Sequence, residues 1–163
     1  INAGTNGSGI ERVILQAING LNGRCIGQGS LLRSGSSLAV LIVSDEGNCS
    51  NDRSCADPSE LISTFTSLGR EPGVNSRVYA LVEKEDNSCA SASHGAHYRS
   101  VVASTNGVAG AICGLDYTNT LAAISENIST ILTNKFSLKG IPDNGVVKIK
   151  VAGNLIPATN YVY

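Results

Sequence analysis

Two carboxylates follow an apolar run of the sequence, at the point where a buried strand would end. Asp45 and Glu46 come directly after residues 38–44 (LAVLIVS). Because loops and helix starts converge at the carboxyl ends of the strands in an open parallel sheet, ligands bind there. The loop that contains Thr5 precedes an expected helix, so its hydroxyl would face the same crevice. Since carboxylate, hydroxyl and water oxygens suit Mg²⁺, or Ca²⁺ where more ligands join, we expect a metal site with Thr5 and Asp45 as ligands.

A simpler interpretation of these residues stays open. Asp45 and Glu46 would then begin a solvated loop and Thr5 would lie in a terminal segment, and the residue pattern alone favours this interpretation. The loop of residues 4–9 (GTNGSG) lacks the Lys-Ser or Lys-Thr ending of a phosphate-binding loop, which argues against a nucleotide. The Gly-x-Ser-x-Gly motif of many serine hydrolases is missing as well.

Two histidines, His94 and His97, stand between Cys89 and Cys113 and raise the question of zinc. Their spacing fits neither a Cys-x-x-Cys pair nor the His-Glu-x-x-His motif. The cysteines are better used in a disulfide bond. We therefore expect both histidines in a loop and a helix start near the rim of the site.

Apolar spacing predicts four helices that alternate with three buried strands. The expected helices cover residues 8–22, 57–68, 96–105 and 116–132, and the expected strands cover residues 38–43, 77–82 and 108–112. Ser8 and Glu11 form a capping box for the first helix, Asp57 with Pro58 marks the start of the second, and Asp116 caps the fourth. The first strand is continuously apolar and partly β-branched, which predicts burial on both of its faces.

This alternation with short connections predicts the α/β class: a three-layer, doubly wound, mostly parallel sheet with helices on both faces, as in Rossmann-like folds. Beyond Pro142 the pattern changes. Residues 146–151 alternate, residues 152–154 (AGN) indicate a turn, and residues 155–163 resemble a returning strand. We therefore expect residues 1–140 to form the α/β part and residues 141–163 a C-terminal β-hairpin, at the sheet edge or leading into a further domain.

Composition limits the possible partners and the compartment. A net charge of -1, with 15% charged residues, gives no basis for binding nucleic acid. No apolar run is long enough to span a membrane. Many Gly, Ser, Thr and Asn residues, with neither Met nor Trp, are typical of exported bacterial surface proteins. The absence of an initiator Met suggests a processed or excised piece of a longer chain.

Five cysteines indicate an oxidising compartment, either extracellular or periplasmic. Cys49 and Cys55 are close enough in sequence to bridge the loop after Asp45, while Cys89 and Cys113 follow successive strands and would join neighbouring loops. Cys25 is then left over. It would pair with a segment outside this chain or remain a buried free thiol, and the sequence supports both alternatives equally.

Several segments, in this order, resemble the later part of a von Willebrand factor A domain of secreted and surface proteins of bacteria. They are GTNGSGIERVILQAI, LAVLIVSDE, RVYALV, GVAGAICGLDYTNTLAAIS and VVKIKVAGNLIP. The resemblance covers nearly the whole chain, and residues 1–140 correspond to the C-terminal portion of such a domain. Domains of this family often carry a metal-ion-dependent adhesion site, built from an Asp-x-Ser-x-Ser loop, a Thr from a second loop and an Asp after a later strand.

By this resemblance, Thr5 matches the Thr of the adhesion site and Asp45 matches the later Asp. The glycine that usually follows that Asp is Glu46 here. The Asp-x-Ser-x-Ser loop, which follows the central strand in the family, has no counterpart in this sequence. A sheet without its central strand leaves backbone groups unpaired, so we expect an N-terminal companion segment or a second chain to complete it.

The resemblance implies extracellular adhesion: recognition of a protein or glycan ligand through Mg²⁺, or through Ca²⁺ or Mn²⁺, rather than catalysis. The expected binding rim comprises Asn6, Glu46, Asn48, His94 and His97. One alternative is a structural subunit of an extracellular fibre or surface assembly, completed by a neighbouring chain. A less favoured alternative is a metal-assisted hydrolase.

Overall fold

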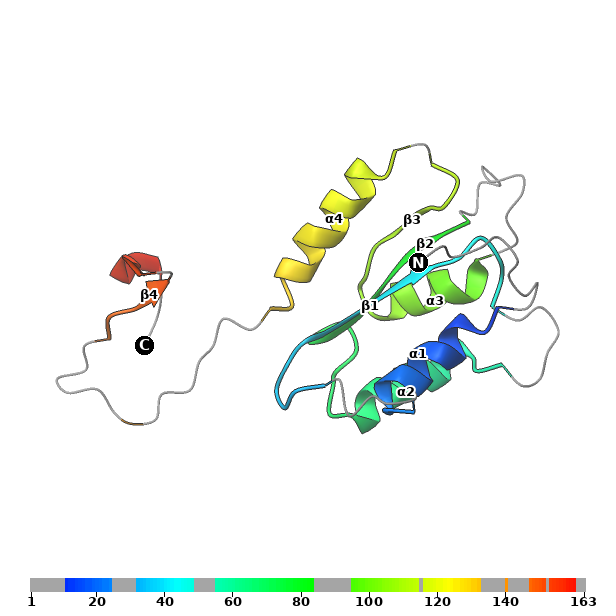
Figure 1. The fold of residues 1–163 in the computed structure, drawn as a ribbon, viewed down its shortest axis with the longest axis horizontal. Coiled ribbons are helices and arrows are strands. Elements are labelled where there is room, and N and C mark those ends of the chain that lie inside the picture. The colour runs from blue at the N-terminus through cyan, green and yellow to red at the C-terminus, as the bar shows by residue number, and fades with distance from the viewer. Residues whose placement is uncertain are drawn as a thin grey trace. The chain divides into compact units, whose positions relative to one another are not determined.

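The computed structural model describes residues 11–24, 32–48, 55–83, 95–114, 116–132, 140, 147–151 and 153–160. The chain divides into two compact units, Ile1–Thr133 and Asn134–Tyr163. The first unit is mixed α/β, with a three-stranded parallel sheet and four α-helices in its described part (Figure 1). This agrees with the α/β class that the alternating pattern predicts.

The sheet of the first unit has the strand order β1-β2-β3, and all three strands are parallel. The strands are β1 (Leu38–Val43), β2 (Ser76–Val82) and β3 (Ala109–Ala111). Leu41 lies opposite Tyr79, and Leu81 lies opposite Gly110. The bounds of β1 are those predicted, while β2 begins one residue earlier and β3 is shorter. Because the strands are parallel, their carboxyl ends all meet at one edge of the sheet.

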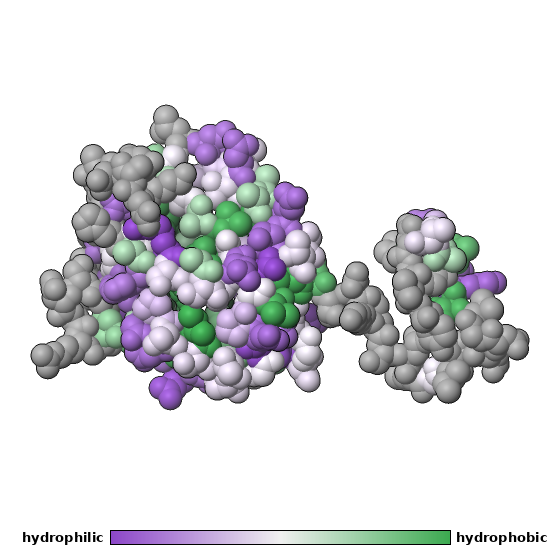
Figure 2. Space-filling view, turned by 180° about the vertical axis from the view of Figure 1, so that it is seen from behind, coloured by the Kyte–Doolittle hydropathy of each residue, from purple (hydrophilic) through white to green (hydrophobic). Residues whose placement is uncertain are grey.

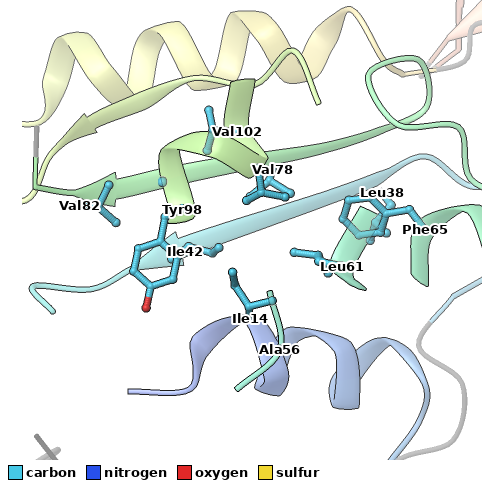
Figure 3. Close-up of a cluster of buried hydrophobic side chains, with 12 residues drawn as sticks. Ile14, Leu38, Ile42, Ala56, Leu61, Phe65, Val78, Val82, Tyr98 and Val102 are labelled. Atoms are coloured by element: carbon cyan, nitrogen blue, oxygen red, sulfur yellow. The ribbon is translucent and has the colours of Figure 1, made fainter. Parts of the chain in front are cut away.

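Three helices cover one face of this sheet: α1 (Val13–Leu21), α2 (Pro58–Ser67) and α3 (Ala96–Ser104). The chain passes from β1 through α2 to β2, and from β2 through α3 to β3, in the same direction along the sheet. Because such connections between parallel strands are right-handed, α2 and α3 lie on the same face. The core between the layers contains side chains of all three helices and of both long strands. Its buried members are Ile14, Leu38, Ile42, Ala56, Leu61, Phe65, Val78, Ala80, Val82, Tyr98, Val101 and Val102 (Figure 3).

The fourth helix, α4 (Thr118–Ser129), packs on the opposite face of the sheet, over β2 and β3. Asn127 anchors it, since its side-chain oxygen accepts hydrogen bonds from Arg77 Nη1 at 2.6 Å and from the Tyr79 hydroxyl at 3.0 Å. Gly110 permits the close approach of α4 to β3, because a Cβ at this position would lie 2.3 Å from Thr120 Cγ2. The covered part of this face is therefore β2 and β3.

The prediction that β1 is buried on both faces is wrong for the structure of this chain. Leu38 and Ile42 are buried under α1 and α2, but Leu41 is 51% exposed and Val43 is 54% exposed on the face that carries α4. No element in the described part of the chain covers this face of β1, because α4 lies over the neighbouring strands. Apolar side chains accordingly reach the surface of this unit among polar ones (Figure 2).

The helix starts agree with the sequence to different degrees. Asp57 caps α2 as predicted, its carboxylate accepting from Ser59 N (2.7 Å) and Glu60 N (3.1 Å), and Glu60 completes a capping box. The capping box expected for α1 is wrong, because α1 begins at Val13, after Glu11, and has no side-chain cap. Asp116 accepts from Thr118 N at 2.8 Å, one residue before the N-cap position of α4.

The second unit contains two short antiparallel strands, β4 (Lys150–Val151) and β5 (Asn154–Leu155). The Ile156 amide donates to the Ile149 carbonyl at 2.8 Å. The strand predicted over residues 155–163 is wrong beyond β5, since Ala158–Asn160 forms a 3-10 turn. Pro157 has no N–H to give to a strand partner, which is consistent with this early end.

Candidate functional site

The end of β1 presents Asp45 at the carboxyl edge of the parallel sheet. Asp45 is exposed, and Glu46 is partly buried beside it. The preceding Ser44 is 4% exposed, and its hydroxyl is paired with both backbone groups of Glu46, at 2.9 Å to the carbonyl and 3.2 Å to the amide. These contacts fold the chain into a turn directly after the strand. A buried serine therefore holds the turn from which the Asp45 carboxylate extends into solvent.

A buried polar cluster lies beneath this turn and comes from three separate segments. The Ser44 hydroxyl donates to the carboxylate of Glu11, the residue that precedes the start of α1 by two positions. Tyr98 of α3 is fully buried, and its ring lies against Ile42 with the hydroxyl directed away from the apolar cluster (Figure 3). We name Glu11, Ser44 and Tyr98 the turn-support cluster.

Electrostatics within the turn-support cluster favour a neutral tyrosine. Burial raises the pKa of Tyr98 to about 12, and the carboxylates of Glu11 and Glu46 act in the same direction, while hydrogen bonding with Ser44 opposes them. The Tyr98 hydroxyl lies near Ser44 but makes no well-aligned hydrogen bond among the residues that the structure describes. Because the pKa is raised to about 12, Tyr98 is protonated at neutral pH and supplies a neutral hydroxyl under the Asp45 turn.

Asn48 has a structural position rather than one on the rim. It is 5% exposed, its amide nitrogen donates to the Ala56 carbonyl at 2.9 Å, and its side-chain oxygen accepts from Ile14 N at 3.4 Å. Glu11 and Asn48 also form a parallel bridge. The side chain thus links the start of α1 to the segment before α2, and its burial does not fit the expected ligand-binding role.

The starts of α2 and α3 bring two further ionisable groups near one another. His97 is exposed in the first turn of α3, as its predicted place at a helix start requires. Hydrogen bonds from Ser59 and Glu60 hold the pKa of Asp57 below the usual value, and an electrostatic contribution from the neighbouring His97 acts in the same direction. An imidazole and a capping carboxylate are therefore neighbours on the helical side of the sheet.

The two cysteines in the described part of the chain, Cys55 and Cys113, are each disulfide-bonded. Cys55 lies just before α2, and Cys113 follows β3. Their expected partners, Cys49 and Cys89, lie outside the described residues, so the pairing stays a prediction. Cys25 also lies outside them.

The remaining predicted site residues Thr5, Asn6 and His94 lie outside the described part of the chain. Within that part, no three His, Cys, Asp or Glu side chains come together as metal ligands. The structure thus supplies one exposed carboxylate at the expected place, with Glu46 next to it. These oxygens have the donor chemistry of a Mg²⁺ site, but they do not complete one.

The turn-support cluster was not anticipated from the sequence. The sequence predicts a helix-cap role for Glu11, and it places Tyr98 only within the helix expected over residues 96–105. One signal was available, because Tyr98 lies three and four positions before Val101 and Val102, which places it on the apolar side of α3. Ser44 gave no comparable signal, since a serine after a strand is ordinary.

In comparisons with known proteins, no family model, no curated protein and no solved structure matches the chain. Among the described residues, no helix has both the length and the apolar character needed to cross a lipid bilayer.

Proposed function

We propose that this chain is a recognition domain of the von Willebrand factor A type, which binds a protein or glycan ligand through a divalent cation at the carboxyl edge of its sheet. Asp45 and Thr5 would hold the cation, and further ligands would come from outside this chain. The observation that carries the proposal is the exposed carboxylate of Asp45 directly after β1, on a turn that the buried Ser44 stabilises. Mg²⁺ is the expected ion, with Ca²⁺ and Mn²⁺ as alternatives.

In this proposal the cation serves recognition and not catalysis. A bound divalent ion offers a position to an acidic group of the ligand. The protein's own part is to hold the turn that carries Asp45, and the contacts of Ser44 with Glu46 and Glu11 stabilise this turn. Glu46 and His97 would belong to the rim around the ion, together with Asn6 and His94. A metal-assisted hydrolase using Asp45 and Glu46 is a weaker alternative.

The finer architecture in this proposal is a three-layer, doubly wound sheet that a companion strand completes beside β1. An N-terminal segment or a second chain would supply that strand, and β4 with β5 would form the C-terminal hairpin extension. The uncovered apolar face of β1, with Leu41 and Val43 about half exposed, supports a missing neighbour. The disulfide-bonded Cys55 and Cys113 support a secreted or cell-surface location.

A second candidate function is that of a structural subunit in an extracellular fibre or surface assembly. The same uncovered face of β1 favours it, because a strand from a neighbouring chain would cover Leu41 and Val43. This candidate needs no cation, so removal of metal distinguishes it from the first.

A titration of the chain with Mn²⁺, followed by amide NMR signals, tests the cation site even where binding is weak. We expect paramagnetic broadening to be strongest for residues 44–47 in the wild-type protein. Asp45→Asn keeps the size of the side chain but removes its charge, so it should weaken Mn²⁺ binding about tenfold or more. Glu71→Gln is the matched control, because Glu71 is an exposed carboxylate in the turn before β2.

The result that would contradict the proposal concerns the same residues. Broadening centred away from residues 44–47, or broadening that Asp45→Asn leaves unchanged, would show that Asp45 holds no cation. Circular dichroism of both variants checks that each keeps the wild-type fold.

A further inference from the structure

The free edge of β1 carries backbone groups that no described strand pairs. The Leu38 amide donates to the Asn75 carbonyl at 2.9 Å and the Ser44 amide donates to the Leu81 carbonyl at 3.1 Å, so the even-numbered residues of β1 direct their backbone groups toward β2. Backbone direction alternates along a strand, and the odd-numbered residues therefore direct N–H and C=O away from β2. Since β1 ends the described sheet, Ala39, Leu41 and Val43 present these groups at its edge.

The same odd-numbered residues present an apolar row on the uncovered face. Ala39, Leu41 and Val43 are exposed, and residues 38–43 contain no charge and no proline. Edge strands that remain open to solvent usually carry a charge, a proline or a bulge that prevents pairing. An uninterrupted apolar edge without any of these devices is suited to pairing with another strand.

The two ends of β1 have opposite charge. Arg33 is exposed shortly before the strand and supplies the accessible charge, while the buried Arg70 lies beside it and donates to the Arg33 carbonyl at 2.7 Å and to Ser36 Oγ at 3.3 Å. Asp45 and Glu46 follow the other end of the strand. A second β1 that runs antiparallel would bring the basic end of each copy to the acidic end of the other. A parallel copy would instead place like charges side by side.

From this charge complementarity and the open edge we infer that β1 is a self-association site whose partner is a second copy of this chain, paired antiparallel through β1. The best register places Leu41 opposite its own counterpart and Ala39 opposite Val43 of the other copy, because it pairs all the free odd-numbered residues. This pairing joins the three-stranded sheets of the two copies into one continuous sheet. The two-fold pairing uses both free β1 edges, so association stops at a dimer.

The same register also joins the uncovered apolar faces. Residues directly opposite in antiparallel strands point to the same face, so Leu41 packs beside its counterpart and Val43 beside Ala39. The inference specifies the partner in the second candidate function, on which it rests, and it does not depend on the cation. Failure of the Mn²⁺ titration and failure of self-association are therefore separate results.

Sedimentation equilibrium of the purified chain in the presence of EDTA tests the pairing. We expect a reversible dimer with a dissociation constant on the order of micromolar. Leu41→Glu introduces two facing charges at the two-fold axis and should give a monomer over the same concentration range. Val74→Glu is the matched control: Val74 is 58% exposed but lies in the turn before β2, so this variant should remain dimeric.

Hydrogen exchange identifies the edge that is used. The amides of Leu41 and Val43 should become protected as concentration rises, while the amide of Ala123, an exposed residue of α4, should keep its exchange rate. Because Leu41 is half exposed, Leu41→Glu should keep the wild-type circular dichroism spectrum. A wild-type monomer at millimolar concentration, or a dimer that Leu41→Glu leaves intact, overturns the inference.

A charge exchange tests the antiparallel orientation. Arg33→Glu should weaken dimerisation about tenfold, because it brings like charges together at each end of the paired strands. Adding Glu46→Lys to Arg33→Glu should restore most of the loss. If the double variant associates no better than the single one, the antiparallel arrangement is wrong.

Discussion

The neighbouring strands β1 and β2 are alike in sequence but are covered differently. Both consist mainly of apolar and β-branched residues. Every residue of β2 except Arg77 is buried, whereas in β1 only Leu38 and Ile42 are buried. The difference arises because α4 is anchored on β2 through Asn127 and leaves the adjacent face of β1 open. An apolar run therefore predicts a strand, but it does not tell whether the same chain covers both of its faces.

The largest expected effect contrasts two residues that lie opposite each other in the register of β1 and β2. Tyr79 is fully buried and donates to Asn127, so Tyr79→Ala should lower the free energy of unfolding by about 3 to 5 kcal/mol. Leu41 is half exposed, so Leu41→Ala should lower it by less than about 1 kcal/mol. Urea unfolding of both variants measures the two values.

This contrast also separates the isolated chain from the dimer inferred above. At low protein concentration Leu41→Ala should be nearly neutral, and its cost should rise with concentration as the β1 edge becomes buried. A large cost of Leu41→Ala that is independent of concentration would mean that Leu41 already has an intramolecular partner. The side chains of β1 and β2 would then differ less in their packing than their exposed fractions indicate.

Local signals in the sequence are sufficient for the three strands of the parallel sheet and for one helix start. The bounds of β1 follow from a continuous apolar run, and Asp57 with Pro58 marks the start of α2 because the cap and the first-turn proline are adjacent in the sequence. The start of α1 could not be predicted in the same way. Glu11 had the spacing of a cap, but in the folded chain its carboxylate is bound by Ser44, which is distant in sequence.

The candidate site likewise has one part that the sequence predicts and one part that it does not. The position of Asp45 follows from strand order, because a residue after a parallel strand must lie at the carboxyl edge. The turn-support cluster depends on three segments meeting in space, so no spacing within one segment indicates it. Asn48 also depends on tertiary packing: the sequence predicts a place on the rim, and in the folded chain its amide lies buried between Ala56 and Ile14.

A smaller effect is expected where the first residues of β2 meet the end of α3. The fully buried Thr105 hydroxyl accepts from Val78 N at 2.9 Å and lies 2.8 Å from the Val101 carbonyl. Thr105→Val keeps the shape of the side chain but leaves the Val78 amide without a partner. We expect a loss of about 1 to 3 kcal/mol in the free energy of unfolding, measured by urea denaturation.

Ser104→Ala is the control for Thr105→Val. Its hydroxyl bonds the Ser100 carbonyl at 2.9 Å but is exposed, so water replaces the lost contact and the change should stay within about 0.5 kcal/mol. Equal effects of the two substitutions would contradict the view that burial distinguishes β2 from the exposed parts of the molecule.

The smallest expected effect lies in α2, the helix that connects β1 to β2. Hydrogen bonds from Ser59 and Glu60 hold the pKa of the Asp57 carboxyl below its usual value of 3.8, so the ionised cap stabilises the folded state. Because the pKa is lowered on folding, this contribution is present above about pH 4 and is lost as pH falls through the folded-state pKa. Asp57→Ala should therefore lower the melting temperature by a few degrees at about pH 7 and by less at about pH 2. Calorimetric melts across this range measure the difference, and a deficit that stays constant down to pH 2 would mean that the cap acts without its charge.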